Sequence, residues 1–413
     1  MRSARRVAPL ARNPSHFPAG VEGQPAGVQP GRVLWVWERL RDWWRQPVVR
    51  YTLVLFIGTR VALTIIGVLS RLALGPMLGH PVWEYSPHSW LSIWGVWDTG
   101  RYLDIAEHGY STALTGGRPQ PNYAFFPLYP LLIRLVGGLL GDTFVAGIIV
   151  SNLLLLLGSV LLYRLVRLDA DEPTALRTVK YLFLFPSAFV LSGVFAESLF
   201  LALSVAAFFS ARRGRWALAG LSGFLAALTR QIGVLIIIPL AYEYLRGVQW
   251  KPIRVRRDVL FLLLVPLGLA TFALYTYYLT GDPLGIIRVR GLLGERLSNP
   301  LRVLVGAMFY GRAHLTFAGG FALAGLLLLG LFSQRIGFAY WFWGTCAILV
   351  PLTTGMGAIL GVPRYMVPAF PLYIILAHLA GRSPTLDHAL GASLVLLQGF
   401  LMAFWTTGSL LMI

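Results

Sequence analysis

The sequence predicts an all-α polytopic membrane protein with about eleven transmembrane helices and with interfacial helices in its first outer loop. Two observations support this prediction. Hydrophobic residues make up 56% of the 413 residues, and the mean hydropathy is +0.68. Charged residues make up only 13%, about half of their usual share in a soluble protein. No soluble fold buries so much apolar surface, so most of it must lie in lipid.

The charge balance bears on the partners of the protein. A net charge of +18 would indicate nucleic acid in a soluble protein. Here the arginines gather in short segments between apolar spans, which indicates control of membrane topology and no nucleic-acid partner. Cys346 is the only cysteine and lies in an apolar span. The sequence therefore excludes a disulfide framework and a cysteine-rich metal site.

The first 50 residues are rich in Arg, Pro and Gly, with nine arginines against three acids. They contain no apolar segment of signal-peptide type, so we expect this tail to be retained. The positive-inside rule places it in the cytoplasm. Its first thirty or so residues have the composition of a disordered segment. Residues 35–44 could form a short amphipathic helix on the membrane surface.

Residues 51–74 form the first expected crossing and carry the chain outward. The loop that follows, 75–123, holds two arginines against four acids, which is the balance of an outer loop. Residues 122–140 are apolar but are interrupted by two prolines and a glycine pair. We interpret them as an interfacial or re-entrant helix, so that the first outer loop extends over residues 75–142.

The second half of the predicted topology depends on basic turns. Residues 216–246 must leave the cytoplasm and return, because both of their ends are basic. They therefore form two helices of roughly fifteen residues, shorter than the usual twenty, with Arg230 at their junction. The amino terminus is then inside and the carboxyl terminus outside. The other crossings are expected at about residues 143–166, 174–191, 197–211, 259–280, 315–333, 338–352, 365–380 and 389–411.

The most informative stretch is WDTGRYLDIAEHGY, residues 97–110. Carboxylates are costly in hydrocarbon, so this stretch must lie at or above the membrane surface. In a helix, Asp98, Arg101, Tyr102 and Ile105 would share one face, whereas the acids at 104 and 107 would lie on another. Two readings remain open: an interfacial helix that presents Asp98, or a solvated acidic loop with interfacial aromatic residues.

Residues 282–314 contradict the charge rule, because this outer loop carries five arginines against two acids. Arginine forks match phosphate oxygens, so a phosphate ligand would explain Arg288 and Arg290. The alternative is contact with anionic lipid headgroups. Arg230 and Arg364 should lie at the same face of the membrane, although each could also be an interfacial arginine without a specific role. We expect loops 75–142 and 282–314 to form the active-site face.

Glu197 lies in a tight outer turn, where it could favour the helix dipole or orient an arginine or a substrate hydroxyl. The histidines show no metal-like spacing, so we expect no metal site made by the protein alone and no cofactor. This leaves room for an ion that the substrate holds in part. The sequence contains neither a Walker loop nor a dinucleotide fingerprint, which disfavours a nucleotide-driven transporter.

An acid in the first outer loop and arginines on the same side suit transfer of a group from a lipid phosphate to an acceptor hydroxyl. The carboxylate would remove the hydroxyl proton, and the arginines would neutralise the leaving phosphate. The alternative is a lipid-linked sugar flippase or an anion transporter. A transporter would be expected to bury its charges near the midplane, in broken helices.

Several segments together resemble the PIG-V-like mannosyltransferases of the GT-C glycosyltransferase superfamily. The resemblance runs along most of residues 50–380, and the order and spacing of its segments are more specific than any one of them. These are WDTGRYLDIAEHGY (97–110), AFFPLYPLLIRL (124–135), FPSAFVLSGVFAESLFLALS (185–204), RRGRWALAGLSGFLAALTR (212–230), GDPL (281–284) and PRYMVPAFPLY (363–373).

The resemblance implies a GT-C-like multispan domain over residues 51–413 and a polyprenyl-phosphate sugar donor used outside the cytoplasm. It implies that Asp98 is the catalytic base. Glu197 and Arg230 match polar positions of the later motifs, and Arg364 with Tyr365 match the Arg-Tyr pair near the end. We therefore expect an inverting enzyme of a bacterial-type cell membrane that transfers mannose to a lipid, glycan or protein acceptor.

Two positions depart from the family pattern. Arg101 stands where the family usually has an aromatic residue, and LTRQIG stands where the family has a motif of the LTRP type. Arg101 adds a cation one helical turn from Asp98, where it could lower the basicity of that carboxylate or hold a phosphate. These departures bear on the choice of acceptor.

Overall fold

The computed structural model describes residues 46–78, 83–112, 121–292, 296–409 and 411, and every secondary-structure element in them is helical. The predicted tail 1–50, with its amphipathic helix at 35–44, lies almost entirely outside the described residues. Helix α2 already begins at Pro47, because a proline is well suited to the first turn of a helix. The described residues from Pro47 onward form one unit.

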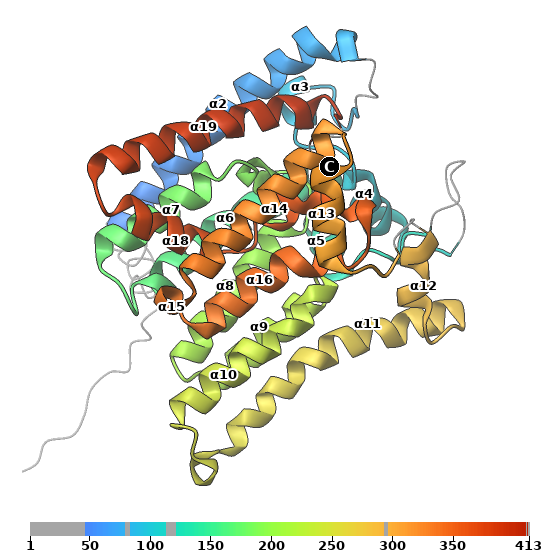
Figure 1. The fold of residues 1–413 in the computed structure, drawn as a ribbon. Coiled ribbons are helices and arrows are strands. Elements are labelled where there is room, and N and C mark those ends of the chain that lie inside the picture. Colours follow the sequence, from blue (N-terminus) through green and yellow to red (C-terminus); the bar gives the residue numbers. More distant parts are fainter. Residues whose placement is uncertain (1–45, 79–82, 113–120, 293–295, 410, 412–413) are drawn as a thin grey trace, which may run out of the picture. The chain divides into compact units, whose positions relative to one another are not determined.

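Five segments of the described chain are long and apolar enough to cross a membrane, and all five were predicted. They belong to α2 (Pro47–Leu78), α6 (Thr143–Val166), η4 (Arg257–Leu263) with α11 (Leu264–Thr280), α14 (Ala313–Leu331) and α19 (Pro384–Thr406). Helices α2 and α19 lie side by side although they are the first and the last helix of this unit in the sequence (Figure 1).

The other expected crossings are shorter helices, so the number eleven stays a prediction. They are α7 (Glu172–Leu184), α8 (Glu197–Arg212), α9 (Trp216–Ala227), α10 (Ile237–Gly247), α16 (Phe338–Leu352) and α18 (Pro371–Ala380). The continuous helix predicted at 174–191 was wrong at its end. Helix α7 ends at Leu184 because Phe185 precedes a proline and adopts the extended conformation that this position favours.

A buried segment without α-helix, residues 185–196, connects α7 to α8 and contains only the short helix η1 (Ala188–Ser192). Backbone groups at membrane depth need partners within the protein. Gln398 of α19 donates hydrogen bonds to the carbonyls of Phe183 and Phe185, at 2.9 and 3.0 Å. Arg60 of α2 donates to the carbonyl of Ala188 at 3.4 Å. Side chains from other helices therefore hold the segment that ends directly at Glu197.

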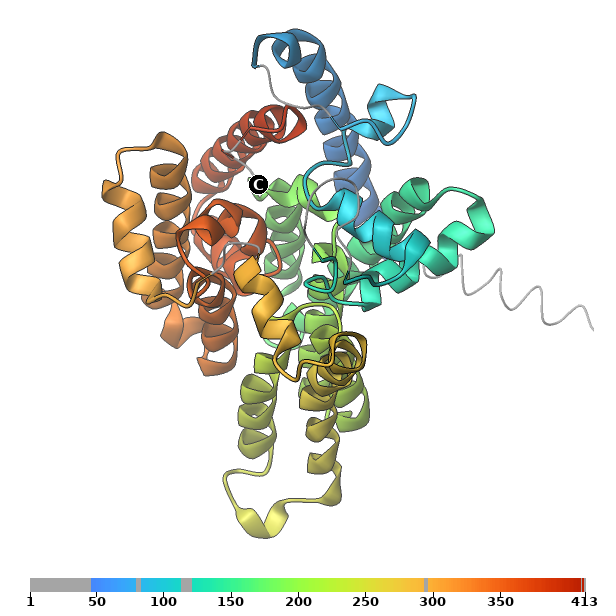
Figure 2. The same cartoon turned by 90° about the vertical axis from the view of Figure 1, so that its right-hand side faces the viewer.

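Helices α9, α10 and α11 form a neighbouring group (Figures 1 and 2). Glycines bring α9 very close to η4 and α11. A Cβ atom at Gly220 would lie 2.0 Å from the carbonyl oxygen of Phe261, and one at Gly268 would lie 2.3 Å from that of Phe224. Such close approach of backbones is a common way of packing helices without a hydrophobic driving force.

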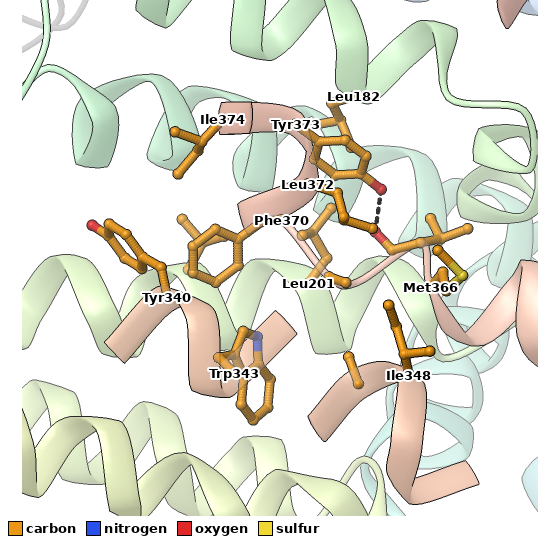
Figure 3. Packing of buried hydrophobic residues seen from close by; sticks show 14 of the residues in the cluster. Leu182, Leu201, Tyr340, Trp343, Ile348, Met366, Phe370, Leu372, Tyr373 and Ile374 are labelled. Carbon is orange, nitrogen blue, oxygen red and sulfur yellow. Dashed lines mark hydrogen bonds between the residues drawn. The ribbon is translucent and has the colours of Figure 1, made fainter. Parts of the chain in front are cut away.

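A large apolar core fixes the turn that precedes α18. Trp343 and Tyr340 of α16 pack against Phe370, beside Tyr373 (Figure 3). The buried Tyr373 hydroxyl donates a hydrogen bond to the carbonyl of Val367. This contact anchors the chain just after the short helix α17 (Val362–Tyr365).

The remaining short elements surround the candidate site or connect the long helices. They are α3 (Ser89–Ser92), α4 (Thr99–His108), α5 (Leu128–Leu140), η2 (Gln231–Ile236), η3 (Pro252–Arg254), α12 (Gly285–Leu292), α13 (Pro300–Phe309), α15 (Ser333–Ile336) and η5 (Met356–Gly361). Helix α5 buries Tyr129 and Ile133 but exposes Leu131 and Leu135. Residues 128–140 are therefore helical as predicted, and their place as an interfacial or a re-entrant helix stays a prediction.

Candidate functional site

The acidic stretch after the first crossing forms helix α4, so the helical reading is confirmed and the loop reading is wrong. Asp98 immediately precedes the helix, and its side chain makes no capping hydrogen bond. Trp97 adopts a left-handed conformation with φ of 50°, which is unusual for a bulky residue. Tyr102 and Ile105 are buried on the face that they were predicted to share with Asp98. The turn at Trp97 therefore directs Asp98 into the protein and not along the start of the helix.

Asp98 belongs to a chain of ion pairs that joins four distant parts of the sequence. Nη1 of Arg364 lies 2.7 Å from Oδ2 of Asp98, and Nε of the same guanidinium lies 3.2 Å from Oε1 of Glu197. Nη1 of Arg230 lies 3.0 Å from that same glutamate oxygen. Glu197 and Arg364 are only 1% and 6% exposed. Arg364 thus holds two carboxylates at once, and Arg230 balances the second of them.

Aromatic rings complete the setting of the two guanidinium groups. The ring of Tyr365 lies 5.0 Å from the guanidinium carbon of Arg230 and 5.1 Å from that of Arg364. Phe195 faces Arg364 at 5.2 Å. Cation–π contacts of this kind favour a charged guanidinium when water is scarce. They also restrict the rotation of both arginines.

Local chain geometry explains why these side chains meet. Glu197 is the first residue of α8 and follows the buried segment 185–196. Arg230 is an extended residue in the break between α9 and η2, as its predicted place at a junction requires. Arg364 lies in α17, where the carbonyl of Pro363 accepts a hydrogen bond of 2.5 Å from the hydroxyl of Ser187. That bond ties α17 to the start of the buried segment.

These residues border a cavity of about 230 Å³. Its polar wall contains Asp98, Tyr102, Arg230, Arg364 and Tyr365, with Arg290 added from α12. Its other walls are largely apolar, and they include Phe125, Phe126, Phe200, Ile232, Val350 and Pro351. A cationic end beside an apolar wall suits a ligand with a phosphate and a hydrocarbon part.

The electrostatics of the site favour charged arginine and neutral tyrosine. Burial by itself would lower the pKa of Arg364, but the Asp98 carboxylate, with Tyr365 and Glu197, holds it well above its usual value. Burial raises the pKa of Tyr102, and the charge of Glu197 raises it further. Tyr102 is therefore a neutral phenol in the cavity wall, able to donate a hydrogen bond to a ligand.

The structure brings together most of the residues that the sequence singled out, but not all of them. Arg290 borders the cavity, whereas Arg288 has a side chain that is 70% exposed and pairs with Asp282 at 3.0 Å. Side chains two positions apart on a helix point in different directions, so α12 cannot present both Arg288 and Arg290 to one ligand. Arg101 is partly exposed and is not part of the cavity wall.

Sequence reasoning missed part of the cavity wall. Thr229 and Gln231 flank Arg230 within LTRQIG and could have been included with it. Thr354, which follows α16, also lines the cavity, but it lies in a region with no polar motif. Ser187 is also absent from the prediction, and no local pattern shows that it bonds to Pro363.

Residues 84–277 match the model of a family described as Mannosyltransferase (PIG-V). The resemblance to the PIG-V-like mannosyltransferases is confirmed. The matched region contains Asp98, Glu197 and Arg230, whereas Arg290 and Arg364 lie beyond it. A search of curated protein sequences finds no match.

One solved structure shows the fold, and a second is similar over much of the chain. ArnT from Cupriavidus metallidurans, bound to undecaprenyl phosphate, superposes with a TM-score of 0.53 at 15% identity, over 83% of this chain and 63% of that one. The Archaeoglobus fulgidus oligosaccharyltransferase, tethered with an acceptor peptide, gives 0.44 at 13% identity, over 89% and 56%. The chain thus spans less than two thirds of either protein. The first of these two structures shows the fold of this chain, and the family that residues 84–277 match is one of mannosyltransferases.

Proposed function

We propose that this protein is an inverting membrane glycosyltransferase that transfers mannose from a polyprenyl-phosphate donor to an acceptor hydroxyl. The observation that carries the proposal is the cavity in which Asp98, paired with Arg364, lies beside the further cations Arg230 and Arg290. A general base and a cluster of phosphate-binding groups are the two elements that this reaction needs. The matched family is one of mannosyltransferases, which favours mannose as the sugar.

Asp98 acts as the general base in this proposal. Its Oδ2 is engaged by Arg364, so we assign Oδ1 to the acceptor hydroxyl. As that oxygen removes the proton, the acceptor oxygen bonds to the anomeric carbon, and the bond from this carbon to the phosphate oxygen breaks. A single displacement inverts the configuration of the sugar. The bonding electrons leave with the polyprenyl phosphate.

The arginines have different roles in the proposed reaction. Arg364 is already engaged with both carboxylates, so we assign it the task of orienting Asp98. Arg230 contacts Glu197 through Nη1, which leaves its other N–H groups for the donor phosphate. Arg290 approaches from another wall of the same cavity. Arg230 and Arg290 would therefore neutralise the leaving phosphate from two sides.

The bilayer and the acceptor are further parts of the proposal. The apolar wall of the cavity offers a path for the start of a polyprenyl chain, and the solved structure of ArnT contains undecaprenyl phosphate. The charge pattern of the loops supports an active site on the extracytoplasmic face of a bacterial-type cell membrane. A lipid, a glycan or a protein can each supply an acceptor hydroxyl.

A lipid-linked sugar flippase is the second candidate, and one observation favours it. Arg230 lies in a broken helix, and the buried Glu197 follows a segment without α-helix, as in the sites of many transporters. The purified protein in proteoliposomes separates the two functions. An enzyme transfers mannose from polyprenyl-phosphate mannose to an added acceptor, whereas a flippase moves the lipid-linked sugar across the bilayer without transferring it. Movement without transfer would overturn the proposal.

Cysteine labelling tests the proposed face. Cys346 is first replaced by alanine, and single cysteines are then introduced at Ser298, in the arginine-rich loop 282–314, and at Gln334, in a basic turn. We expect a membrane-impermeant thiol reagent to label the cysteine at 298 only from outside the cell and the cysteine at 334 only from inside. Labelling with the opposite pattern would place the active site on the cytoplasmic face.

A further inference from the structure

A second cavity, larger than the candidate site, lies where α8 ends and η4 begins. Its volume is about 830 Å³, and we call it the basic pocket. Its charged wall residues are Arg212, Arg246, Arg254, Arg256, Glu243 and Asp258. Four arginines therefore face two carboxylates, so the pocket has an excess of positive charge.

The two carboxylates of the pocket already have partners. Glu243 pairs with Arg246 at 3.0 Å and lies 3.6 Å from Arg212. Arg212 also forms a forked contact with Asp169, at 2.5 and 2.7 Å. Asp258 accepts a hydrogen bond of 2.7 Å from Tyr244. No ion pair of the described residues joins either carboxylate to Arg254 or Arg256, which are both exposed. These two arginines are therefore the ones open to an anionic ligand.

The rim of the basic pocket is apolar as well as cationic. Ile253 lines the pocket and has 93% of its surface exposed, and Trp250, which precedes it in the same loop without lining the pocket, is 58% exposed. Trp250 adopts a left-handed backbone with φ of 59°, which turns the chain sharply before η3. Tryptophan, isoleucine and arginine on one short loop form the combination that favours a membrane surface. A soluble anion would gain nothing from Ile253.

The pocket and the candidate site lie at opposite ends of the same helices. Helix α8 carries Glu197 at its first residue and Arg212 at its last, about 22 Å apart at the rise of an α-helix. The span of η4 and α11 begins beside Asp258, and the chain reaches Arg290 soon after this span ends (Figure 1). If the span of η4 and α11 crosses the membrane as expected from the sequence, the basic pocket lies at the side opposite to the proposed donor.

We propose that the basic pocket binds the phosphate headgroup of an anionic phospholipid in the opposite leaflet. Arg254 and Arg256 would contact the phosphate, while Ile253 and Trp250 would lie against the upper acyl chains. The amino-terminal tail of the chain is a poor alternative occupant, because its nine arginines against three acids repel a cationic pocket. The inference does not depend on the proposed enzyme activity.

Lipid binding to the full-length protein in a neutral detergent tests this proposal. Short-chain phosphatidylglycerol is titrated in, and bound lipid is counted by native mass spectrometry, with phosphatidylcholine and inorganic phosphate as separate ligands. We expect phosphatidylglycerol to bind more tightly than either. Because each arginine near a lipid surface contributes about fivefold in affinity, the double variant Arg254→Gln with Arg256→Gln should bind about 30-fold more weakly.

A matched variant controls for general surface charge. Arg213 and Arg215 are exposed at the same end of α8 and α9 but do not border the pocket. Changing both to Gln removes the same charge, and we expect binding close to that of the wild type. Ile253→Ser should weaken phosphatidylglycerol but leave inorganic phosphate unchanged. Thermal unfolding without added lipid checks that each variant is folded.

Three outcomes would overturn the proposal. An equal loss of phosphatidylglycerol affinity in the two double variants would mean that the lipid is attracted by the general surface charge and not by a defined pocket. Unchanged binding in the Arg254 and Arg256 variant would place the lipid elsewhere. Inorganic phosphate that binds as tightly as phosphatidylglycerol would identify a site for a soluble anion instead of a lipid.

Discussion

The candidate site and the basic pocket lie at opposite ends of α8 and both contain several arginines, but the charges are arranged differently. In the candidate site, Arg364 and Glu197 have side chains only 7% and 2% exposed and are paired with each other. In the basic pocket, Arg254 and Arg256 are exposed and exceed the available carboxylates. Buried and paired charges hold a fixed geometry, whereas an exposed excess attracts a ligand and responds to salt.

The largest expected effect of the predictions comes from Asp98→Asn in the candidate site. Asparagine keeps the shape of the side chain but cannot accept the acceptor proton, so kcat should fall by about 10²–10⁴-fold while donor binding survives. Transfer from polyprenyl-phosphate mannose measures this. Glu84→Gln, an exposed acid of the same outer loop, is the matched control and should keep its activity. Near-normal transfer by the Asp98 variant would show that another group is the base.

The second prediction tests whether Arg364 is a positioning residue. Arg364→Met leaves two carboxylates without their shared cation, which should cost roughly 3–5 kcal/mol of stability and lower kcat more than it raises donor KM. Arg364→Lys keeps the charge but can no longer reach both carboxylates, so it should rescue stability better than activity. Thermal unfolding and transfer kinetics measure the two effects.

Arg382→Met is the control for the Arg364 variants, because Arg382 is exposed and should change stability by less than about 0.5 kcal/mol. A rise in donor KM without a change in kcat would contradict the positioning role. It would make Arg364 a direct phosphate ligand, as the sequence first suggested.

The third prediction separates the arginines that line the cavity, Arg230 and Arg290, from Arg288. Losing a hydrogen bond to a charged ligand costs about 1.5–3 kcal/mol, so Arg230→Gln and Arg290→Gln should each raise donor KM by roughly 10- to 100-fold. Arg288→Gln should have little effect, because its exposed pair with Asp282 contributes at most about 1 kcal/mol. Donor kinetics of the three variants test this. Equal effects at 288 and 290 would show that the loop rearranges around the donor.

The smallest expected effect is that of salt concentration on lipid binding and on transfer. It tests directly whether the candidate site and the basic pocket differ in exposure. Raising the ionic strength from about 0.1 M to 1 M shortens the Debye length from about 10 Å to 3 Å. Phosphatidylglycerol binding at the exposed basic pocket should weaken several-fold. Transfer kinetics should change less, because the ion pairs of the candidate site are buried. Equal sensitivity of both would indicate that the candidate site is open to solvent.

The membrane character, the helical class and the resemblance to a mannosyltransferase family could all be predicted from the sequence. They depend on composition, on the length of apolar runs and on local motifs, which need no knowledge of distant contacts. The break at Arg230 was also predictable, because basic residues at both ends of 216–246 left too few residues for two ordinary crossings. The periodicity of residues 97–110 left a helix and a loop both open, but the four charged residues that line the cavity had all been singled out.

Only the tertiary structure decided how these residues are used. The periodicity of α12 cannot say whether Arg288 or Arg290 faces the cavity, since that depends on how the helix is rotated against its neighbours. The pairing of Arg364 with both Asp98 and Glu197 joins residues more than 160 positions apart. It exists because side chains of α2 and α19 hold the buried segment 185–196 in place, and Ser187 then fixes α17. Long-range packing of this kind leaves no signature in a local sequence pattern.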